Sequence, residues 1–442
     1  MPVAQRQVEL RHQLLDRLAE ARANTDQLFS IVKPEAIYDR PIPERHRIVF
    51  YIGHLEAFDW NLLRERVLSL DPFHPDFDRL FAFGIDPVGG GLPTDQPSDW
   101  PTIDAVRDYV AEVRKTLDDA LADLLADDQP SHGDLALLLQ VAVEHRLMHA
   151  ETLAYMLHQL PIHRKIRPSG GPEVVVNSPK SEMVSIPAGR VTLGLSRKDP
   201  SAFGWDNEFE AHFVNVPAFS IDRYKVTNRD FHAFMEAGGY DSEQFWSKED
   251  WAWKTAASIA HPGFWVKRNK AWYQRTMFSE TPLPMDWPVY ISQAEASAYA
   301  RWVGKALPTE AQWQRAAFGT PDGDERQFPW GSETPSSKHG NFDFQRWDPT
   351  PVGAFPEGAS AFGVTDLVGN GWEWTSTPFG PFPGFEPFPF YRGYSADFFD
   401  NKHFVMKGGS PRTAACMLRR SFRNWFQSHY PYVYAGFRCV SH

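Results

Sequence analysis

The sequence predicts an α+β protein of two domains, a helical bundle followed by a loop-rich domain of short strands. The first 160 residues are rich in Leu, Ala, Arg and Glu, and their apolar side chains recur at helical spacing. The remainder is rich in Trp, Phe, Gly and Pro. Of the 16 tryptophans, only Trp60 and Trp100 precede residue 180. A shift in composition this sharp indicates two domains of different class.

Four segments of the first domain have the periodicity of amphipathic helices, at 8–19, 44–68, 102–125 and 133–160. The last is apolar over most of its circumference, so we expect it to be the most buried. Four such helices with mostly short connections form a bundle. The exception is the connection Asp71–Pro101, which carries four glycines. A loop of that length in a compact domain is more often functional than not.

A linker is expected next, because Pro161–Pro179 contains four prolines and two glycines and loses the helical period. The predicted boundaries are 1–160 for the bundle, 161–180 for the linker and 181–442 for the second domain. That domain has strand-like runs at 183–195, 212–224 and 263–275, and helical segments at 227–239, 292–304 and 308–319. The last helix begins with a Thr309-x-x-Gln312 capping box.

Composition excludes several classes of function. The net charge is −11 with no basic run, which disfavours binding to nucleic acid or to an anionic membrane. No stretch approaches about 18 consecutive apolar residues, and the first twenty residues lack the apolar core of a signal peptide. Two cysteines, Cys416 and Cys439, cannot form a disulfide framework. We therefore expect a cytoplasmic protein, and no feature of the sequence specifies an oligomeric state.

Two histidines of the fourth helical segment are candidates for metal ligands. His145 and His149 are four residues apart, which places them about 40° apart on one helix face. His54, which follows Gly53 in an apolar helix, is the candidate for a third ligand. Glu151 lies about 200° round from His149, so we do not expect it to bind the metal directly. Because the chain has 16 histidines, a pair at this spacing can arise by chance. A structural role for His145 and His149 therefore stays open on the pair alone.

Motifs of the second domain resemble the landmarks of the formylglycine-generating-enzyme (sulfatase-modifying-factor) fold, which is similar to C-type lectins. They occur in the expected order over roughly residues 181–442. The matching runs are EMVSIPAGRVTLG, LPTEAQWQRAA, LVGNGWEWTSTPF, VMKGGSPR and YAGFRCV. The resemblance implies an aromatic fold with little regular structure, in which Trp372 and Trp374 pack in the core.

The whole chain resembles the iron-dependent sulfoxide synthases of ergothioneine biosynthesis, in which a DinB-like four-helix bundle precedes this domain. The bundle motifs are Gly53-His54 and His145-x3-His149-x-Glu151. The resemblance implies that His54, His145 and His149 bind Fe(II). It also implies an enzyme that uses O2 to join a thiol, such as cysteine or γ-glutamylcysteine, to the imidazole C2 of Nα-trimethylhistidine. The sulfur is oxidised to a sulfoxide in the same reaction.

The same resemblance implies roles for residues near the end of the chain. Asn424 would face the trimethylammonium group, beside Arg423 and Trp425. Either Tyr391 or Tyr394 would act as proton donor or hydrogen-bonding group near the bound oxygen. A quaternary ammonium suits an aromatic-lined pocket. Packing in the core or fixing of loops is the competing interpretation for each of these side chains.

Some positions depart from the family pattern. Met148 stands where a glutamine is common, Phe426 where some members have aspartate, and GHLEAFDW where the run GHTTWFFE is usual. The loop that commonly carries an arginine for the carboxylate of the thiol is GGGLPTDQPSDWP, without arginine. The nucleophile therefore stays open between different thiols and a selenium compound, as does methylation of the histidine. The alternative carboxylate receptors are Arg392, Arg412, Arg419, Arg420 and Arg423.

Two further functions compete with the sulfoxide synthase. A formylglycine-generating oxidase would need a cysteine pair that holds copper, and Cys416 and Cys439 are the only candidates. A non-catalytic lectin-like binding protein would need no three-histidine site. The metal therefore discriminates between these possibilities.

Overall fold

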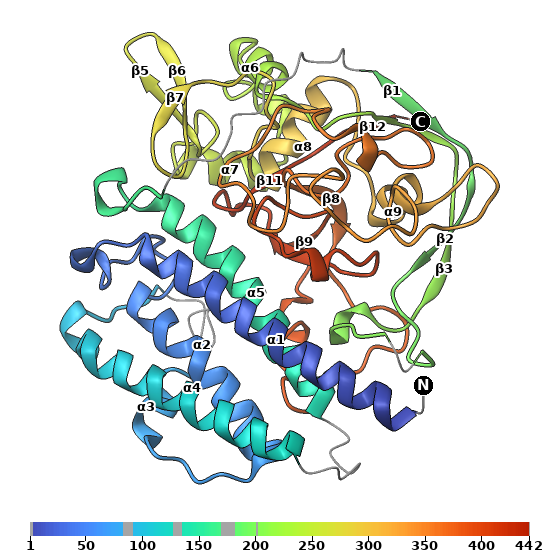
Figure 1. Cartoon of the computed structure of the whole chain (residues 1–442). Coiled ribbons are helices and arrows are strands. Elements are labelled where there is room, and N and C mark those ends of the chain that lie inside the picture. Colours follow the sequence, from blue (N-terminus) through green and yellow to red (C-terminus); the bar gives the residue numbers. More distant parts are fainter. Residues whose placement is uncertain (1–2, 83–91, 127–134, 169–181, 200–201, 442) are drawn as a thin grey trace. The chain divides into compact units, whose positions relative to one another are not determined.

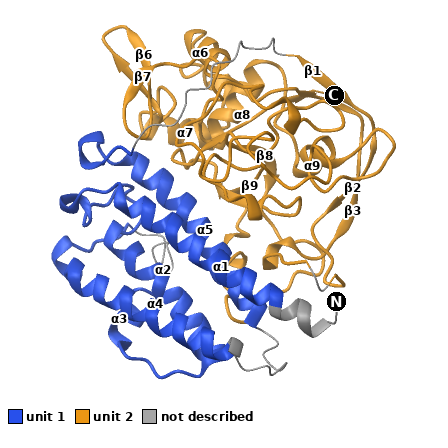
Figure 2. Ribbon diagram, viewed as in Figure 1, with its two compact units in different colours: residues 1–169 blue, residues 170–442 orange. Residues whose placement is uncertain are grey.

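The protein folds into two compact units, residues 1–169 and residues 170–442, which Figure 2 shows in blue and orange. The structure is a computed structural model that describes residues 3–82, 92–126, 135–168, 182–199 and 202–441. The division lies inside the predicted linker. The first residues of that segment nevertheless pair with the bundle, since the Ile166 N–H donates to the Ile31 carbonyl at 2.7 Å. The helical unit therefore extends beyond residue 160.

Unit 1 contains the four long helices that the sequence predicts. The helices are α1 (Val3–Ser30), α2 (Ile48–Leu63), the short α3 (Pro75–Leu80), α4 (Ile103–Ala126) and α5 (Leu135–Gln159), as seen in Figure 1. A π-helical turn (Arg64–Leu68) extends α2, and 3-10 turns lie at Pro34–Ala36, Pro97–Asp99 and Ile162–Arg164. Helix α1 packs against α5, while α2 packs against both α4 and α5. Helix α5 is buried on most sides, as its apolar sequence predicts.

The connection between α2 and α4 is fastened to the bundle at both of its described ends. Phe81, at the end of α3, packs on Gly53 of α2, where a Cβ atom would lie 2.6 Å from the phenyl ring. At the other end, Asp95 accepts hydrogen bonds from Arg47 Nε at 2.9 Å and Trp100 Nε1 at 2.8 Å. The glycines of this connection, Gly84, Gly89, Gly90 and Gly91, lie outside the described residues.

The described strands of unit 2 form four small sheets. Their orders are β1-β4-β12, β10-β9-β8-β11, β2-β3 and β5-β6-β7. The strands are β1 (Met183–Ile186), β2 (Gly189–Leu193), β3 (His212–Val216), β4 (Phe219–Asp222), β5 (Trp265–Arg268), β6 (Ala271–Arg275), β7 (Glu280–Pro282), β8 (Trp372–Pro378), β9 (His403–Lys407), β10 (Asn424–Gln427), β11 (Ala435–Gly436) and β12 (Val440–Ser441). Pairs are antiparallel except β8 with β11. All three predicted strand regions are confirmed.

Unit 2 also contains the helices α6 (Asn228–Glu236), α7 (Lys248–Ala256), α8 (Gln293–Trp302) and α9 (Glu310–Phe318). The capping box of α9 is confirmed, because the Thr309 N–H donates to Gln312 Oε1 at 2.9 Å and the Gln312 N–H to Thr309 Oγ1 at 3.1 Å. Helix α7 was not predicted from the sequence. Within the described ranges, none of the helices of either unit combines the length and the apolar character that crossing a bilayer requires.

Strand β8 lies in the interior of unit 2, where Trp372 and Trp374 are buried as predicted. Between them, the carboxylate of Glu373 accepts from Arg438 Nε at 2.6 Å and from Trp313 Nε1 at 2.9 Å. The ammonium of Lys225 lies 3.1 Å from the same carboxylate. Buried charges of both signs are therefore paired, and this strand is structural.

Candidate functional site

Three histidine side chains of unit 1 converge on one point. His54 comes from α2, and His145 and His149 come from successive turns of α5. The Nε2 atom of His149 lies 3.3 Å from that of His54 and 3.1 Å from that of His145. The ligand atoms of all three lie within 4.8 Å of one another. Within the described residues, this is the group of His, Cys, Asp and Glu side chains close enough to share a metal ion.

The three imidazoles are held neutral. They are buried, at 4%, 2% and 5% exposure, and burial lowers the pKa of His54 to about 4. Burial and the neighbouring imidazoles also lower the pKa values of His145 and His149 well below the usual range. Neutral imidazole is the form that binds a metal, so each ring offers a lone pair at physiological pH.

The orientation of His54 is fixed by its other ring nitrogen. Nδ1 lies 2.7 Å from the carbonyl oxygen of Phe81, which can only accept, so Nδ1 carries the proton. The lone pair of Nε2 then faces the other histidines, an arrangement typical of metal-binding histidines. Gly53 permits this contact, because only a residue without a side chain lets Phe81 approach α2 so closely.

Aromatic rings pack directly on the ligand histidines. Phe58 stacks on His145 with ring centroids 3.4 Å apart, and Phe50 stacks on His54 at 4.9 Å. These contacts lock the imidazole rings and exclude water from their faces. Three buried, neutral nitrogen donors fit a divalent transition metal that keeps open coordination positions.

The glutamates next to these histidines take other places. Glu144 is buried and accepts a hydrogen bond from Gln140 Nε2 at 3.1 Å, one turn earlier on α5. Glu151 is only half-buried and does not join the three histidines. The position of Glu151 agrees with the angular argument from the sequence.

Sequence reasoning missed a buried charge cluster that is centred on the same two helices and also includes arginines of α4 and α1. The carboxylate of Glu56 accepts from Arg146 at 2.9 Å and from Arg114 at 2.7 Å, and Asp59 accepts from Arg146 at 2.6 Å. Burial alone would raise the pKa of Glu56, but Arg146, Arg114 and Arg22 together lower it to about 2. The available signal was the presence of charged residues on faces that are otherwise apolar.

In unit 2, the predicted aromatic residues lie in one cluster, which we call the aromatic cluster. Its members are Trp205, Phe379, Tyr391, Tyr394, Phe398 and Trp425. Trp425 stacks on Phe379 with centroids 4.1 Å apart and meets Tyr394 edge-on at 5.5 Å. Trp205, a residue that sequence reasoning missed, stacks on Tyr394 with ring centroids 4.1 Å apart. Tyr394 is therefore the candidate tyrosine that contacts Trp425, while Tyr391 lies 5.5 Å from Tyr394.

Asn424 begins strand β10 and is half-buried, and its Oδ1 accepts from the N–H of Trp425 at 2.8 Å. This bond fixes the amide beside the aromatic cluster.

Arg423 differs from the substrate-facing position that the resemblance implies. It is 2% exposed, and its Nε lies 2.9 Å from Glu310 Oε1. Its Nη1 donates to the carbonyl oxygens of Asn207 and Gly380 at 3.1 and 3.0 Å. The guanidinium also lies over the ring of Phe382 at 3.9 Å. With these partners, Arg423 ties loops together behind strand β10.

The other arginines proposed as carboxylate receptors differ in burial and in the groups that they contact. Arg419 binds the buried carboxylate of Glu208 through Nε at 2.8 Å, and Arg420 lies 3.2 Å from Glu325. Arg412 is buried over the ring of Trp347 at 4.0 Å. Arg392 is exposed.

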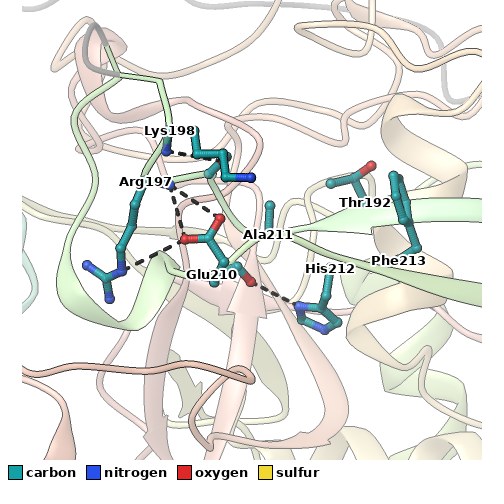
Figure 3. A pocket seen from close by; sticks show the side chains of 8 residues that line it. Thr192, Arg197, Lys198, Glu210, Ala211, His212 and Phe213 are labelled. Atoms are coloured by element: carbon teal, nitrogen blue, oxygen red, sulfur yellow. Dashed lines mark hydrogen bonds and ion pairs between the residues drawn. The ribbon is translucent and has the colours of Figure 1, made fainter.

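An open hollow of about 480 Å³ lies at the β2–β3 hairpin and contains none of the predicted site residues (Figure 3). Two of its charged groups pair with each other, since Glu210 accepts from the Arg197 N–H at 3.1 Å and lies 3.8 Å from the Arg197 guanidinium. The remaining lining is Thr192, Ser196, Lys198, Ala211, His212 and Phe213. Because its lining is half-buried or exposed and includes none of the predicted site residues, it lacks the character of a catalytic site.

Comparison with known proteins agrees with both units. Residues 17–153 match the DinB superfamily, and residues 172–442 match the Sulfatase-modifying factor enzyme 1-like domain. A hercynine oxygenase of Mycolicibacterium smegmatis is 34% identical, over 97% of this chain and 98% of its own length. This chain belongs to the hercynine oxygenase family. The predicted fold class, a DinB-like bundle followed by a lectin-like sulfatase-modifying-factor domain, is thereby confirmed.

Two further relatives are similar to this chain over most of its length. A hercynine oxygenase of Mycobacterium tuberculosis is 37% identical over 75% of this chain and 76% of its own length. The ergothioneine biosynthesis protein 1 of Neurospora crassa is 28% identical over 92% of this chain and 55% of its own length.

The two cysteines of this member of the hercynine oxygenase family differ in their exposure to solvent. Cys416 is an exposed free thiol and Cys439 a buried one. Burial raises the pKa of the Cys439 thiol well above its usual value, and the neighbouring Asp222 adds to the shift. A buried thiol held protonated is a poor metal ligand, which disfavours a copper-dependent formylglycine-generating activity.

Proposed function

We propose that this protein is a non-heme Fe(II), O2-dependent sulfoxide synthase of ergothioneine biosynthesis. It joins a thiol to the imidazole C2 of hercynine, which is Nα-trimethylhistidine, and oxidises the sulfur. The observation that carries the proposal is the buried group of three neutral imidazoles. The names of the related hercynine oxygenases support the choice of substrate.

The overall reaction balances with O2 as the oxidant. The C–H bond of the imidazole and the S–H bond of the thiol break, and a C–S bond and an S–O bond form. One oxygen atom of O2 becomes the sulfoxide oxygen, and the other leaves as water with the two hydrogens. Fe(II), when bound by three histidines, supplies open positions at which a thiolate and O2 can be brought together.

The residues of the chain divide the remaining work. His54, His145 and His149 hold the metal, while Phe50 and Phe58 shield the imidazole faces from water. The aromatic cluster offers ring faces to a quaternary ammonium, an attraction worth about 0.5–2 kcal/mol. Asn424 orients the substrate beside Trp425, and the hydroxyl of Tyr394 or Tyr391 donates a proton or a hydrogen bond. Packing of Tyr394 on Trp425 favours Tyr394.

The nucleophile is proposed only as a class, a thiol or a selenium compound. Residues 92–101 of the connection between α2 and α4 contain no arginine, and Asp95 in this stretch pairs with Arg40 and Arg47 of the bundle. A receptor for the carboxylate of the nucleophile is therefore not provided by residues 92–101. Exposed Arg392 is the candidate that we would test first.

The metal is tested by anaerobic purification followed by measurement of bound iron. We expect iron in the wild-type protein and none in His145→Ala. His158→Ala is the matched control, because His158 is also buried on α5 but lies outside the three-histidine group. A wild-type protein without affinity for iron would refute the proposal.

The substrates are tested with Fe(II), O2 and hercynine, together with cysteine, γ-glutamylcysteine, glutathione or a selenium nucleophile in turn. Unmethylated histidine replaces hercynine in a parallel series. Products are identified by mass spectrometry, and we expect a C–S-bonded sulfoxide with one of the thiols or a C–Se-bonded product. Absence of both products across the panel would reject the proposed reaction while leaving the metal site intact.

A further inference from the structure

The carboxylate of Glu56 is the meeting point of all four long helices of unit 1. It lies on α2, is 1% exposed, and is approached by arginines of the other three helices. Arg146 of α5 lies 2.9 Å away, Arg114 of α4 lies 2.7 Å away, and Arg22 of α1 lies 4.0 Å away. The interior of the bundle thus carries a charge cluster where apolar packing is the usual solution.

Arg146 forms hydrogen bonds with three residues in one turn of α2. Its Nη1 donates to Glu56, and its Nη2 donates both to Asp59 at 2.6 Å and to the backbone carbonyl of Leu55 at 3.0 Å. Arg146 and Asp59 are both fully buried. A planar guanidinium bound at three points tolerates little sliding of one helix along the other.

The residues that form these hydrogen bonds are neighbours of the metal ligands in the sequence. Arg146 follows His145, and Leu55 follows His54. A slip of α2 along α5 by one residue would move His54 by about 1.5 Å. Metal–ligand distances tolerate deviations of only about 0.2 Å, so the register of these two helices decides whether the three Nε2 atoms can share an ion.

A role in stability alone explains the cluster poorly. Buried ion pairs are often no more stabilising than apolar residues of the same volume, whereas fixing one register is the best-attested use of such groups. Arg114 offers an internal comparison, because it also binds Glu56 but lies on α4, which carries no ligand histidine.

We propose that Arg146, together with Glu56 and Asp59, forms a positioning cluster that sets the register of α2 against α5 and thereby the geometry of the metal site. The inference rests on the proposed metal function of the three histidines. Arg146 acts through the helices and does not itself touch the metal or a substrate.

The test compares Arg146→Lys with Arg114→Lys, two matched changes that keep the charge and lose the fork-shaped contact. Each apo protein is titrated with Co(II) alone under anaerobic conditions, and the visible absorption of the bound ion is recorded. Iron content and the thermal unfolding of the apo proteins are measured in parallel. We expect Arg146→Lys to weaken Co(II) binding about 10- to 100-fold and to change the spectrum. We expect Arg114→Lys to stay within about threefold of the wild type with an unchanged spectrum.

The outcomes separate the inference from the function on which it rests. Wild-type affinity and spectrum in Arg146→Lys would overturn the inference. So would equal weakening in both variants, since that indicates general stability. If Arg146→Lys does not fold, Asp59→Asn replaces it with the same expectation and the same refutation. A wild-type protein that binds neither Co(II) nor Fe(II) would overturn the metal proposal itself, and the inference with it.

Discussion

The two units present their candidate functional groups in opposite ways. In unit 1, His54, His145 and His149 project from regular helices and are braced by buried charges. In unit 2, the aromatic cluster is assembled from loops and strand ends that are more than 200 residues apart in the sequence, from Trp205 to Trp425. Side chains held by regular helices suit a metal, which needs exact ligand distances. Side chains held by loops suit an organic cation, because its attraction to ring faces tolerates variation in distance and angle.

The largest effect is expected from removing one of the three histidines of unit 1. His149→Ala leaves two histidines, so we expect iron content and product formation to fall to background. The control is His429→Ala in unit 2, a half-buried histidine that pairs with Asp250 at 2.8 Å and belongs to neither site. Metal analysis and mass spectrometry measure both quantities. Iron at the wild-type level in His149→Ala would contradict the assignment.

The next effect concerns the choice between the two tyrosines of unit 2. If Tyr394 donates a proton to the reaction, Tyr394→Phe should lower kcat by about 100-fold or more, since general acid catalysis contributes about 10²–10⁴-fold. Tyr391→Phe should retain most activity, because Tyr391 packs against the ring of Tyr394, with centroids 5.5 Å apart, and Tyr394 is the ring that meets Trp425. Single-turnover kinetics with iron-loaded protein measures the difference. The reverse order of the two variants would move the role to Tyr391.

The third prediction tests how the helices of unit 1 place His54. In Gly53→Ala the new Cβ would lie 2.6 Å from the ring of Phe81, whose carbonyl oxygen orients the imidazole. We expect Co(II) affinity to fall about 10-fold or more, as for other partners behind a metal ligand. We also expect the free energy of unfolding to fall by about 1–3 kcal/mol from overpacking.

The matched control for that change is Gly263→Ala, where the nearest atom would lie 3.7 Å from the new Cβ. An unchanged Co(II) affinity in Gly53→Ala would show that Phe81 does not position His54.

The contrast between the units also explains what the sequence could predict. Helical periodicity placed His145 and His149 on one face of α5, because four residues make about one turn. His54 was the candidate third ligand because it follows Gly53 in an apolar helix, and the resemblance to a known family supported that choice. The buried cluster of Glu56 and Arg146 was missed, because periodicity says which face is buried but does not identify the partners of a buried charge.

Unit 2 could be predicted less fully, because loop geometry has no period. The motif resemblance located Asn424 and Trp425, but nothing in the sequence joins Trp205 to Tyr394. The motif resemblance also did not give the partners of Arg423, whose guanidinium binds Glu310 and two backbone carbonyls.

The fourth prediction is a pH dependence confined to unit 2. Lys407 on β9 is buried, and burial lowers the pKa of its ammonium to about 8, although Glu310 opposes the shift. In the unfolded chain the same group keeps its proton up to a pH of about 10.5. Between these values the unfolded state binds more protons, so the free energy of unfolding should rise with pH, by about 2 kcal/mol from pH 7.5 to pH 9.5.

Urea unfolding followed by tryptophan fluorescence reports on this unit, which contains 14 of the 16 tryptophans. Lys407→Met should be less stable at pH 7.5, because the ammonium donates to the carbonyl oxygens of Arg420 and Phe422 at 3.0 and 2.6 Å. Its stability should lack the rise with pH. Equal slopes in the two proteins would show that Lys407 does not titrate in this range.

The smallest effect is expected from a change in the aromatic cluster of unit 2, where we propose that the organic cation binds. Trp425→Leu removes the ring that stacks on Phe379 at 4.1 Å and meets Tyr394 at 5.5 Å. We expect the KM for hercynine to rise about 2- to 30-fold, which corresponds to about 0.5–2 kcal/mol of cation–π attraction. Iron affinity should be unchanged, because the three histidines that form the metal site among the described residues all belong to unit 1. Trp330→Leu is the matched control, since Trp330 stacks on His339 and lies outside the aromatic cluster. Loss of iron in Trp425→Leu would break the division of work between the two units, whereas an unchanged KM would remove Trp425 from the hercynine site.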